Sequence, residues 1–320
     1  MQRRLIATTL LALALAGCVG PIAVTPPASS SPSAASVPPS STAASPTAPS
    51  ASAPPLMTLA DLPRIDGSTA NIPLISMTIQ RVTGVSADVA DNTVKTTGTP
   101  TAWRNIVDGT ADLLVVYEAD KTVQAEVKAS GVRLEVHPIG RDALVFFTNS
   151  SNPVTSLSTK QYKAIYTGSI TKWSQVGGRD VKIIGYQRPE ESGSQALLRK
   201  YVVGSAKMAK APKDRITAEM GEIISGVADY ANTGNAIGYS VYYYLANMYA
   251  VDGIKMLGVS GVMPSSATIA DGTYPYTNDF FAVVRADEPA DSPARKVAEW
   301  LTGGDGQATV RDAGYVPATP

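Results

Sequence analysis

The sequence predicts an α/β fold for residues 57–320. Short apolar runs typical of buried strands alternate there with amphipathic patterns typical of helices. The strand-like runs are 112–116, 143–147, 181–186, 236–239 and 280–284. The helical candidates are 70–82, 100–108, 158–166, 193–203, 241–249 and 293–302. Roughly 260 residues of this composition can bury the core of one two-lobed domain or of two smaller ones.

The N-terminus has the three parts of a secretory signal. Arg3 and Arg4 form a basic start, an apolar run covers 5–16, and small residues lead to Cys18. About a dozen apolar residues are too few for a membrane span, which needs about 20. We therefore expect residues 1–17 to be a signal peptide that is removed.

Cys18 is the only cysteine of the chain, so no disulfide can form within it. Residues 15–18 read Leu-Ala-Gly-Cys, which resembles the lipobox of bacterial lipoproteins. In those proteins the cysteine carries the lipid and becomes the first residue. The expected location is therefore the outer face of the cytoplasmic membrane, with a lipid anchor on Cys18.

Residues 18–56 are expected to form a tether. After Cys18 the segment is mostly Ser, Ala, Pro and Thr and has no charged residue. Such a composition buries too little apolar surface to offset the entropy of ordering, so it predicts a disordered, partly extended chain. The whole sequence has 27 basic and 27 acidic side chains and no basic cluster, which makes nucleic acid a poor partner.

Three hydroxyl-bearing turns begin predicted helices, and each is a candidate anion site. They are Gly67-Ser68-Thr69, Thr99-Pro100 with Thr99 as the expected N-cap, and Ser192-Gly193-Ser194. Helix N-termini offer unpaired N–H groups to anions, and glycine lets the backbone approach a ligand. Each turn taken alone is more typical of an ordinary helix cap. Arg188, four residues before Ser192, favours the anion interpretation, because a guanidinium can grip an oxyanion with two hydrogen bonds.

The chain from about 60 to 320 resembles the phosphate-binding components of bacterial ABC importers, in the type II periplasmic-binding-protein superfamily. Arg188, three further residues and then Ser192-Gly193-Ser194 look like that family's phosphate motif, with Ser194 in place of a threonine. Gly67-Ser68-Thr69 looks like its first phosphate loop. Further segments follow in the family's order, namely 143–149, 152–154, 157–158, 165–173, 234–239, 272–275, 306–307 and 314–317.

The resemblance implies two α/β lobes with a ligand cleft between them, joined by crossover segments that act as a hinge. One lobe would hold about 57–143 and 247–320, and the other about 144–246. It also implies a protein, expected to be a monomer, that binds inorganic phosphate and delivers it to an ABC permease without catalysis. No cofactor and no metal are expected.

By the same resemblance, loops 67–70 and 97–101 would face Arg188 and loop 192–195 across the cleft. A ligand that contacts both sides closes such a cleft, because it makes all its contacts only in the closed state. The predicted donors are Ser68, Thr69, Thr99, Arg188, Ser192, Gly193 and Ser194. This set suits any small tetrahedral oxyanion, so phosphate and a similar oxyanion both remain open.

Phosphate binders of this family also use an acidic side chain, which accepts the proton of phosphate and repels sulfate. The resemblance locates it just after the strand 112–116, where Tyr117 lies nearest to the expected position and Glu118 follows it. Glu118 is the predicted acceptor. Asp112 and Asp120 are expected to be surface or capping residues.

Two functions of other classes remain as alternatives. A membrane-tethered sensory or interaction protein could keep the same fold and dock to a membrane partner instead of a transporter. A hydrolase could use Ser192 as its nucleophile, but the sequence around it lacks a Gly-x-Ser-x-Gly signature. His137 is the only histidine, which excludes a histidine-rich metal site and leaves one candidate base for a triad.

Overall fold

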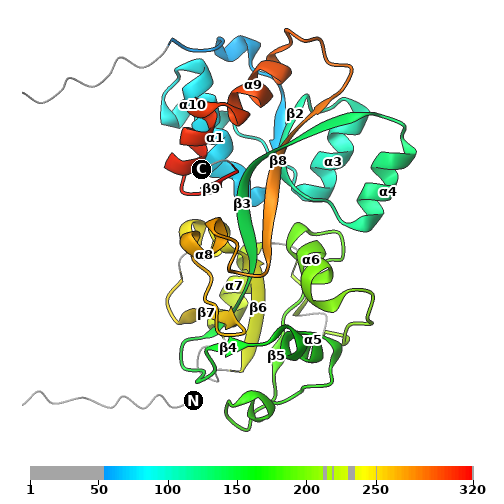
Figure 1. Cartoon of the computed structure of the whole chain (residues 1–320), viewed down its shortest axis with the longest axis vertical. Coiled ribbons are helices and arrows are strands. Elements are labelled where there is room, and N and C mark those ends of the chain that lie inside the picture. The colour runs from blue at the N-terminus through cyan, green and yellow to red at the C-terminus, as the bar shows by residue number, and fades with distance from the viewer. Residues whose placement is uncertain (1–53, 212–214, 218–219, 230–234, 250, 319–320) are drawn as a thin grey trace, which may run out of the picture. The chain divides into compact units, whose positions relative to one another are not determined.

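Strands β3 (Leu134–Asn149) and β8 (Thr277–Arg285) run between the two halves of the folded region (Figure 1). The computed structural model describes residues 54–318 apart from 212–214, 218–219, 230–234 and 250. The predicted signal peptide, Cys18 and nearly all of the predicted tether lie outside the described residues.

The first half-sheet joins β1 (Ile65–Gly67), β2 (Leu113–Tyr117), β8 and residues 134–143 of β3. β1 runs parallel to β2, whereas β2 and β3 both run antiparallel to β8, and β9 (Val316–Pro317) adds to β3. All five residues of β2 are buried, as expected for a strand that is covered on both faces. The helices of this half are α1 (Ile72–Thr83), α2 (Ala87–Thr93), α3 (Thr99–Asp108), α4 (Lys121–Ala129), α9 (Pro293–Thr302) and α10 (Gly304–Asp312), with the short turns η1 (Leu59–Asp61) and η2 (Thr69–Asn71).

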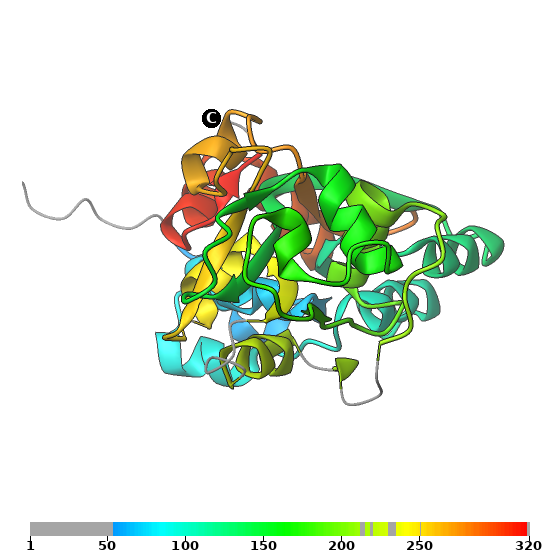
Figure 2. The ribbon, with the colours of Figure 1, turned by 90° about the horizontal axis from the view of Figure 1, so that it is seen from below.

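The second half-sheet joins residues 144–149 of β3 to β6 (Ala236–Val241) and β7 (Ile254–Val259), both antiparallel to it. β5 (Ile184–Gly185) extends it in parallel with β6, and β4 (Ser156–Leu157) pairs with β7. Its helical elements are α5 (Thr159–Thr167), η3 (Trp173–Val176), α6 (Gly193–Leu198), η4 (Arg199–Val203), α7 (Met220–Asp229), η7 (Tyr244–Met248) and α8 (Ser266–Ala270). Seen from below, α3 and α4 lie at one side of the molecule and α8 lies at the other (Figure 2).

The change of partner along β3 marks the first crossover between the halves. Ala143 pairs with Thr277 of β8, and the next residue, Leu144, pairs with Val241 of β6. This change falls where the expected lobe boundary lies, between 143 and 144. The fold is thus the α/β fold with two lobes that the sequence predicts.

The second crossover differs from the expectation that residues 247–320 belong to the first lobe. β7 pairs with residues 146–149 of β3 and therefore with the second half-sheet. After β7, the next strand that pairs with the first half-sheet is β8. We therefore take β8, not the segment near 246, as the second crossover.

The five predicted strands are present, although only Ile184–Gly185 of the run 181–186 forms a strand. The predicted helix over 241–249 is present over 242–248, mostly as the π-helical turn η7, and it begins one residue late because Val241 still pairs with β3 in β6. The predicted helix 193–203 begins as α6 and continues as the π-helical η4.

Candidate functional site

The first loop follows β1, and a glycine lets it come close to β2. A Cβ atom on Gly67 would lie 2.1 Å from the carbonyl oxygen of Val115, so only glycine fits there. The N–H of Ser68 donates to that same oxygen at 3.2 Å, and its hydroxyl accepts the backbone N–H of Tyr117 at 3.1 Å. β2 therefore fixes both the backbone and the hydroxyl of the buried Ser68. Thr69 follows, half-buried, as the first residue of η2.

The second loop brings Thr99 against Ser68. Their hydroxyl oxygens lie 2.7 Å apart, and both residues are buried. Helix α3 begins at Thr99, and its N-cap is Gly98 with φ +86°, a conformation that glycine adopts readily. The expectation that Thr99 is the N-cap is therefore wrong by one residue. The N–H of Gly98 also donates to the carbonyl oxygen of Gly67 at 3.1 Å, which ties the two loops together.

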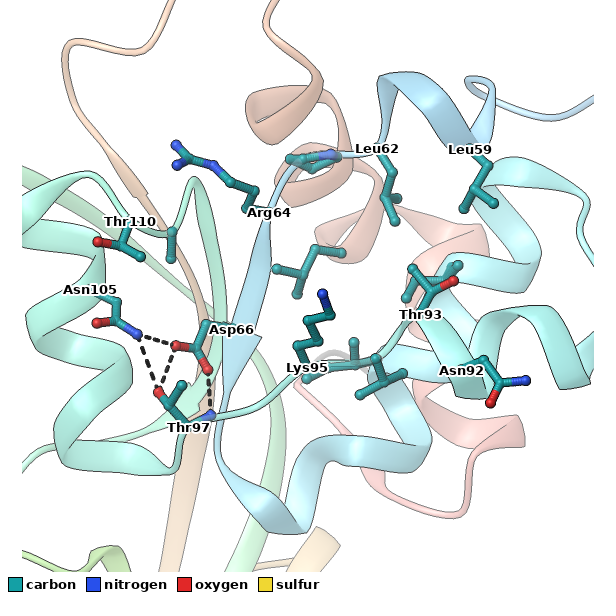
Figure 3. Close-up of a pocket in the computed structure, with 16 residues that line it drawn as sticks. Leu59, Leu62, Arg64, Asp66, Asn92, Thr93, Lys95, Thr97, Asn105 and Thr110 are labelled. Carbon is teal, nitrogen blue, oxygen red and sulfur yellow. Dashed lines mark hydrogen bonds between the residues drawn. The ribbon is translucent and has the colours of Figure 1, made fainter.

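The carboxylate of Asp66 holds the first two loops together through hydrogen bonds (Figure 3). One oxygen accepts the N–H groups of Gly67, at 2.6 Å, and Thr97, at 2.8 Å. The other accepts the Thr97 hydroxyl and the Asn105 amide, each at 2.7 Å. Asp66 is only 6% exposed, so these four hydrogen bonds replace the water that it loses on folding.

A cavity of about 630 Å³ lies beside Asp66, lined also by Lys95, Thr97 and Asn105 (Figure 3). Arg64 contributes to its rim and is held by Asp112 through hydrogen bonds of 2.8 Å and 2.5 Å. The predicted anion-binding residues do not line this cavity. Its wall includes Asp66, Thr97 and Asn105, which support the two loops, but not the hydroxyls of Ser68 and Thr99.

The third loop is held by a buried tyrosine of β6. The backbone N–H of Arg188 donates to the hydroxyl of Tyr239 at 2.8 Å, and this hydroxyl in turn donates to the side-chain oxygen of Gln195. Tyr239 and Gln195 are both fully buried. β6 therefore fixes the backbone at Arg188 together with the first turn of α6.

The first and third loops belong to different halves, and the second loop meets the third directly. A Cβ atom built on Gly193 would lie 2.8 Å from the hydroxyl oxygen of Thr99. Beside this contact, the hydroxyl oxygens of Ser192 and Ser194 are buried and have no hydrogen-bond partner among the described residues. The structure thus brings Ser68, Thr99 and Gly193 together, with two further hydroxyl donors next to them.

Five other helices of this chain have an N-cap hydrogen bond that these turns lack. The side chain at the N-cap accepts a backbone N–H at α2, α4, α5, α8 and α9, where the capping residues are Ser86, Asp120, Ser158, Ser265 and Ser292. Ser68 at η2 and Ser192 at α6 are N-caps without such a bond, as are Thr58 at η1 and Asn71 at α1. The hydroxyls of Ser68 and Ser192 therefore do not serve the capping role that their positions suggest.

Glu118 and Tyr117, at the end of β2, point to different surroundings. The Glu118 carboxylate pairs with Lys200 of η4 and accepts the Gln124 amide at 3.3 Å. It lines a separate cavity of about 590 Å³ between α4 and η4, and neither of these two bonds reaches the three loops. Tyr117 is buried, and its hydroxyl donates to Asp142 at 2.5 Å. The role of Glu118 as proton acceptor for the ligand stays a prediction.

Sequence reasoning missed the residues that hold the loops. Asp66 directly precedes Gly67-Ser68, and an acidic residue at the end of a buried strand was the one available signal. Tyr239 lies within a predicted strand, but its bond to Arg188 spans 51 residues and leaves no local pattern. Among the residues that the structure describes, no cluster of three His, Cys, Asp or Glu side chains is arranged to hold a metal ion. In the same part of the chain, every helix is too short or too polar to cross a membrane.

Comparisons with known proteins agree with this architecture. The family model of the PBP superfamily domain matches residues 38–305. The phosphate-binding protein PstS of Bacillus subtilis is 27% identical over 256 residues, which cover 80% of each chain. PstS of Pseudomonas aeruginosa strain PAO1 is 24% identical and covers 70% of this chain and 73% of its own. A solved ABC-type phosphate transport receptor from Vibrio cholerae has a TM-score of 0.59 at 21% identity, covering 79% of this chain and 98% of its own.

Proposed function

This chain belongs to the PBP superfamily, and we propose that it binds inorganic phosphate outside the cytoplasm and delivers it to an ABC permease. One observation carries the proposal. Thr99 and Gly193 come from different halves and are in contact, beside the buried hydroxyls of Ser192 and Ser194 that lack a described partner. A ligand that accepts hydrogen bonds from both halves would complete this arrangement.

The chemistry of the donors supports a small oxyanion. A buried anion is costly unless its oxygens are hydrogen-bonded, and each charge-assisted bond contributes about 1.5–3 kcal/mol. Ser68, Thr99, Ser192 and Ser194 offer hydroxyls, and Arg188 offers a guanidinium for a bidentate contact. Phosphate, with four oxygens and a negative charge, matches such a set better than a neutral solute does.

Capture in this proposal is a binding equilibrium between open and closed forms. The ligand favours the closed form because only there do the loops of both halves reach it. Release to the permease then requires the halves to separate again. No bond of the ligand is made or broken, so the protein acts as a carrier and not as an enzyme.

We further propose that the carrier is a monomeric lipoprotein, attached through Cys18 and residues 18–56 as its tether. A cysteine with two acyl chains holds a protein stably at a membrane, whereas one chain holds it only marginally. In cells, Cys18→Ser should release the protein from the membrane fraction. Mass spectrometry of the N-terminal peptide should find a diacylglyceryl group on the wild-type cysteine.

Calorimetric titration of the chain that lacks residues 1–17 tests the ligand. We expect tight binding of phosphate and a loss of about 30-fold or more in affinity for Arg188→Ala, because a buried charge contact is worth about 2–5 kcal/mol. Arg179→Ala is the matched control, since Arg179 is an exposed arginine of the same half. If phosphate gives no binding while another small anion binds tightly, the phosphate assignment is wrong.

A further inference from the structure

A buried carboxylate lies at the crossover between the two half-sheets. Asp142 directly precedes Ala143 and Leu144, the two residues at which β3 changes its partner from β8 to β6. Its side chain is on the chain segment that any movement of one half against the other must bend or twist. Asp142 is 1% exposed, so its carboxylate depends on protein donors.

Those donors come from both half-sheets. The hydroxyl of Tyr117, at the end of β2, donates to one carboxylate oxygen at 2.5 Å. The other oxygen accepts the N–H of Ala143 at 2.7 Å and that of Tyr243, just after β6, at 3.1 Å. One side chain thus joins β2, the crossing strand and the segment that follows β6.

Tyr117 connects this carboxylate to the first loop. Its backbone N–H donates to the hydroxyl of Ser68 at 3.1 Å, and the Ser68 hydroxyl lies 2.7 Å from that of Thr99. Its carbonyl oxygen accepts the indole N–H of Trp103 at 2.9 Å. Both backbone groups of Tyr117 and its hydroxyl are therefore engaged, so a displacement of its side chain moves the groups that orient Ser68.

We propose that Asp142 is a positioning residue for the anion site. It acts through Tyr117 and keeps the Ser68 hydroxyl in place relative to the point where β3 crosses between the half-sheets. This inference rests on the proposed function, because it assigns Asp142 to the same binding site. It predicts that the first loop loses its geometry when the bond between Tyr117 and Asp142 is removed.

The test compares Tyr117→Phe with Tyr162→Phe in the chain that lacks residues 1–17. Both substitutions remove one buried tyrosine hydroxyl, but that of Tyr162 donates to Gly258 at 2.9 Å, away from the three loops. We expect Tyr117→Phe to weaken phosphate binding about tenfold, in line with the loss of one buried hydrogen bond, and Tyr162→Phe to leave it unchanged. Similar losses of thermal stability in the two variants show that the difference in binding is not one of folding.

Asp142 itself is tested by two substitutions. The amide of Asp142→Asn can accept the two backbone N–H groups and donate to the Tyr117 oxygen, so it should keep the affinity within about threefold. Asp142→Ala leaves all three groups without a partner and should bind as weakly as Tyr117→Phe or more weakly. If Asp142→Ala does not fold, the Tyr117→Phe comparison still decides the proposal.

Hydrogen exchange without ligand separates this inference from the proposed function. Tyr117→Phe should speed the exchange of the Ser68 amide, whereas Tyr162→Phe should not. Wild-type affinities and unchanged Ser68 exchange in both Tyr117→Phe and Asp142→Ala would overturn the positioning role. If the wild type binds no phosphate but Tyr117→Phe speeds the exchange at Ser68, the positioning role stands and the phosphate assignment fails.

Discussion

Arg104 and Glu191 form an ion pair between the two halves, with the guanidinium nitrogen and the carboxylate oxygen 3.0 Å apart across 87 residues of sequence. Arg104 lies on α3, which begins at Thr99, and Glu191 directly precedes Ser192. Lys200 and Glu118 form a second ion pair between the halves. Because each pair joins one half to the other, both form only when the halves are close together.

A double-mutant cycle on phosphate affinity should detect the first pair. We expect Arg104→Met and Glu191→Gln to be non-additive by about two- to fivefold, as is usual for exposed ion pairs, and the coupling to vanish in about 0.5 M salt. The cycle removes the direct effect of each charge on the anion, which single variants would retain. Calorimetry at low and high salt measures it.

Arg81 and Asp312 provide the control cycle, because they are also 3.0 Å apart and exposed but both belong to the first half. Their coupling should leave the phosphate affinity unaffected. Equal coupling in the two cycles would show that the Arg104–Glu191 pair does not respond to closure.

The contact between Gly193 and Thr99 predicts a strong effect of one methyl group. Gly193→Ala places a carbon 2.8 Å from the Thr99 hydroxyl oxygen, which this arrangement cannot accept unless the Thr99 side chain or one of the two loops moves. We expect phosphate affinity to fall about tenfold or more, the usual effect of overpacking at a tight contact. Gly304→Ala is the control, since Gly304 also begins a helix and its added carbon meets no atom within 4 Å. Unchanged affinity in Gly193→Ala would mean that closure does not need this approach.

The hydroxyl-bearing turns could be predicted from the sequence because their signals are local. Serine or threonine with glycine, ahead of an apolar helical pattern, identifies Ser68, Thr99 and Ser192 one at a time. The contacts among them depend on the tertiary structure, since Ser68 and Thr99 lie 31 residues apart and Gly193 comes from the other half. Only the family resemblance anticipated that the loops face one another.

The surroundings of Tyr117 and Glu118 illustrate what the sequence leaves undecided. Successive residues of a strand point to opposite faces, so a shift of one position exchanges the interior for the surface. Tyr117 is 3% exposed, whereas the Glu118 side chain is 40% exposed and pairs with Lys200. Counting residues from the end of a strand cannot resolve such a difference, because the register depends on the pairing of β2 with β8.

Asp66 lies outside the three loops, but we expect it to affect both the stability of the protein and its affinity for phosphate. Asp66→Ala removes the acceptor of four hydrogen bonds, including those from the backbone N–H groups of the buried Gly67 and of Thr97, which should lower the free energy of unfolding by about 3 kcal/mol. Phosphate affinity should fall as well, because the first two loops lose their common support. Asn105→Ala removes one of the four bonds and should cost about 1 kcal/mol in urea unfolding. Equal losses in the two variants would contradict the role of Asp66 as the common support of the two loops.

Asp142 should also make the stability of the protein depend on pH in mildly acidic solution. Burial raises the pKa of its carboxyl to about 6, against the opposing effect of the hydrogen bonds from Tyr117, Ala143 and Tyr243. The titratable groups that face it are Tyr117, Tyr243 and Tyr315, which are neutral in this range, and Asn278 is its partner on β8. The proton on Asp142 is therefore not controlled by a neighbouring charge.

The sign follows from proton binding. An unfolded aspartate has a pKa of about 3.9, so between about pH 4 and pH 6 the folded protein binds more protons at this site than the unfolded chain. Its stabilising contribution is fully present below about pH 4 and is lost as the pH rises through about 6, a change on the order of 2–3 kcal/mol. Asp142→Asn cannot titrate, so the difference in unfolding free energy between wild type and variant should fall over this range in urea unfolding. A difference that rises with pH would mean that the three hydrogen bonds outweigh burial and keep the carboxylate charged.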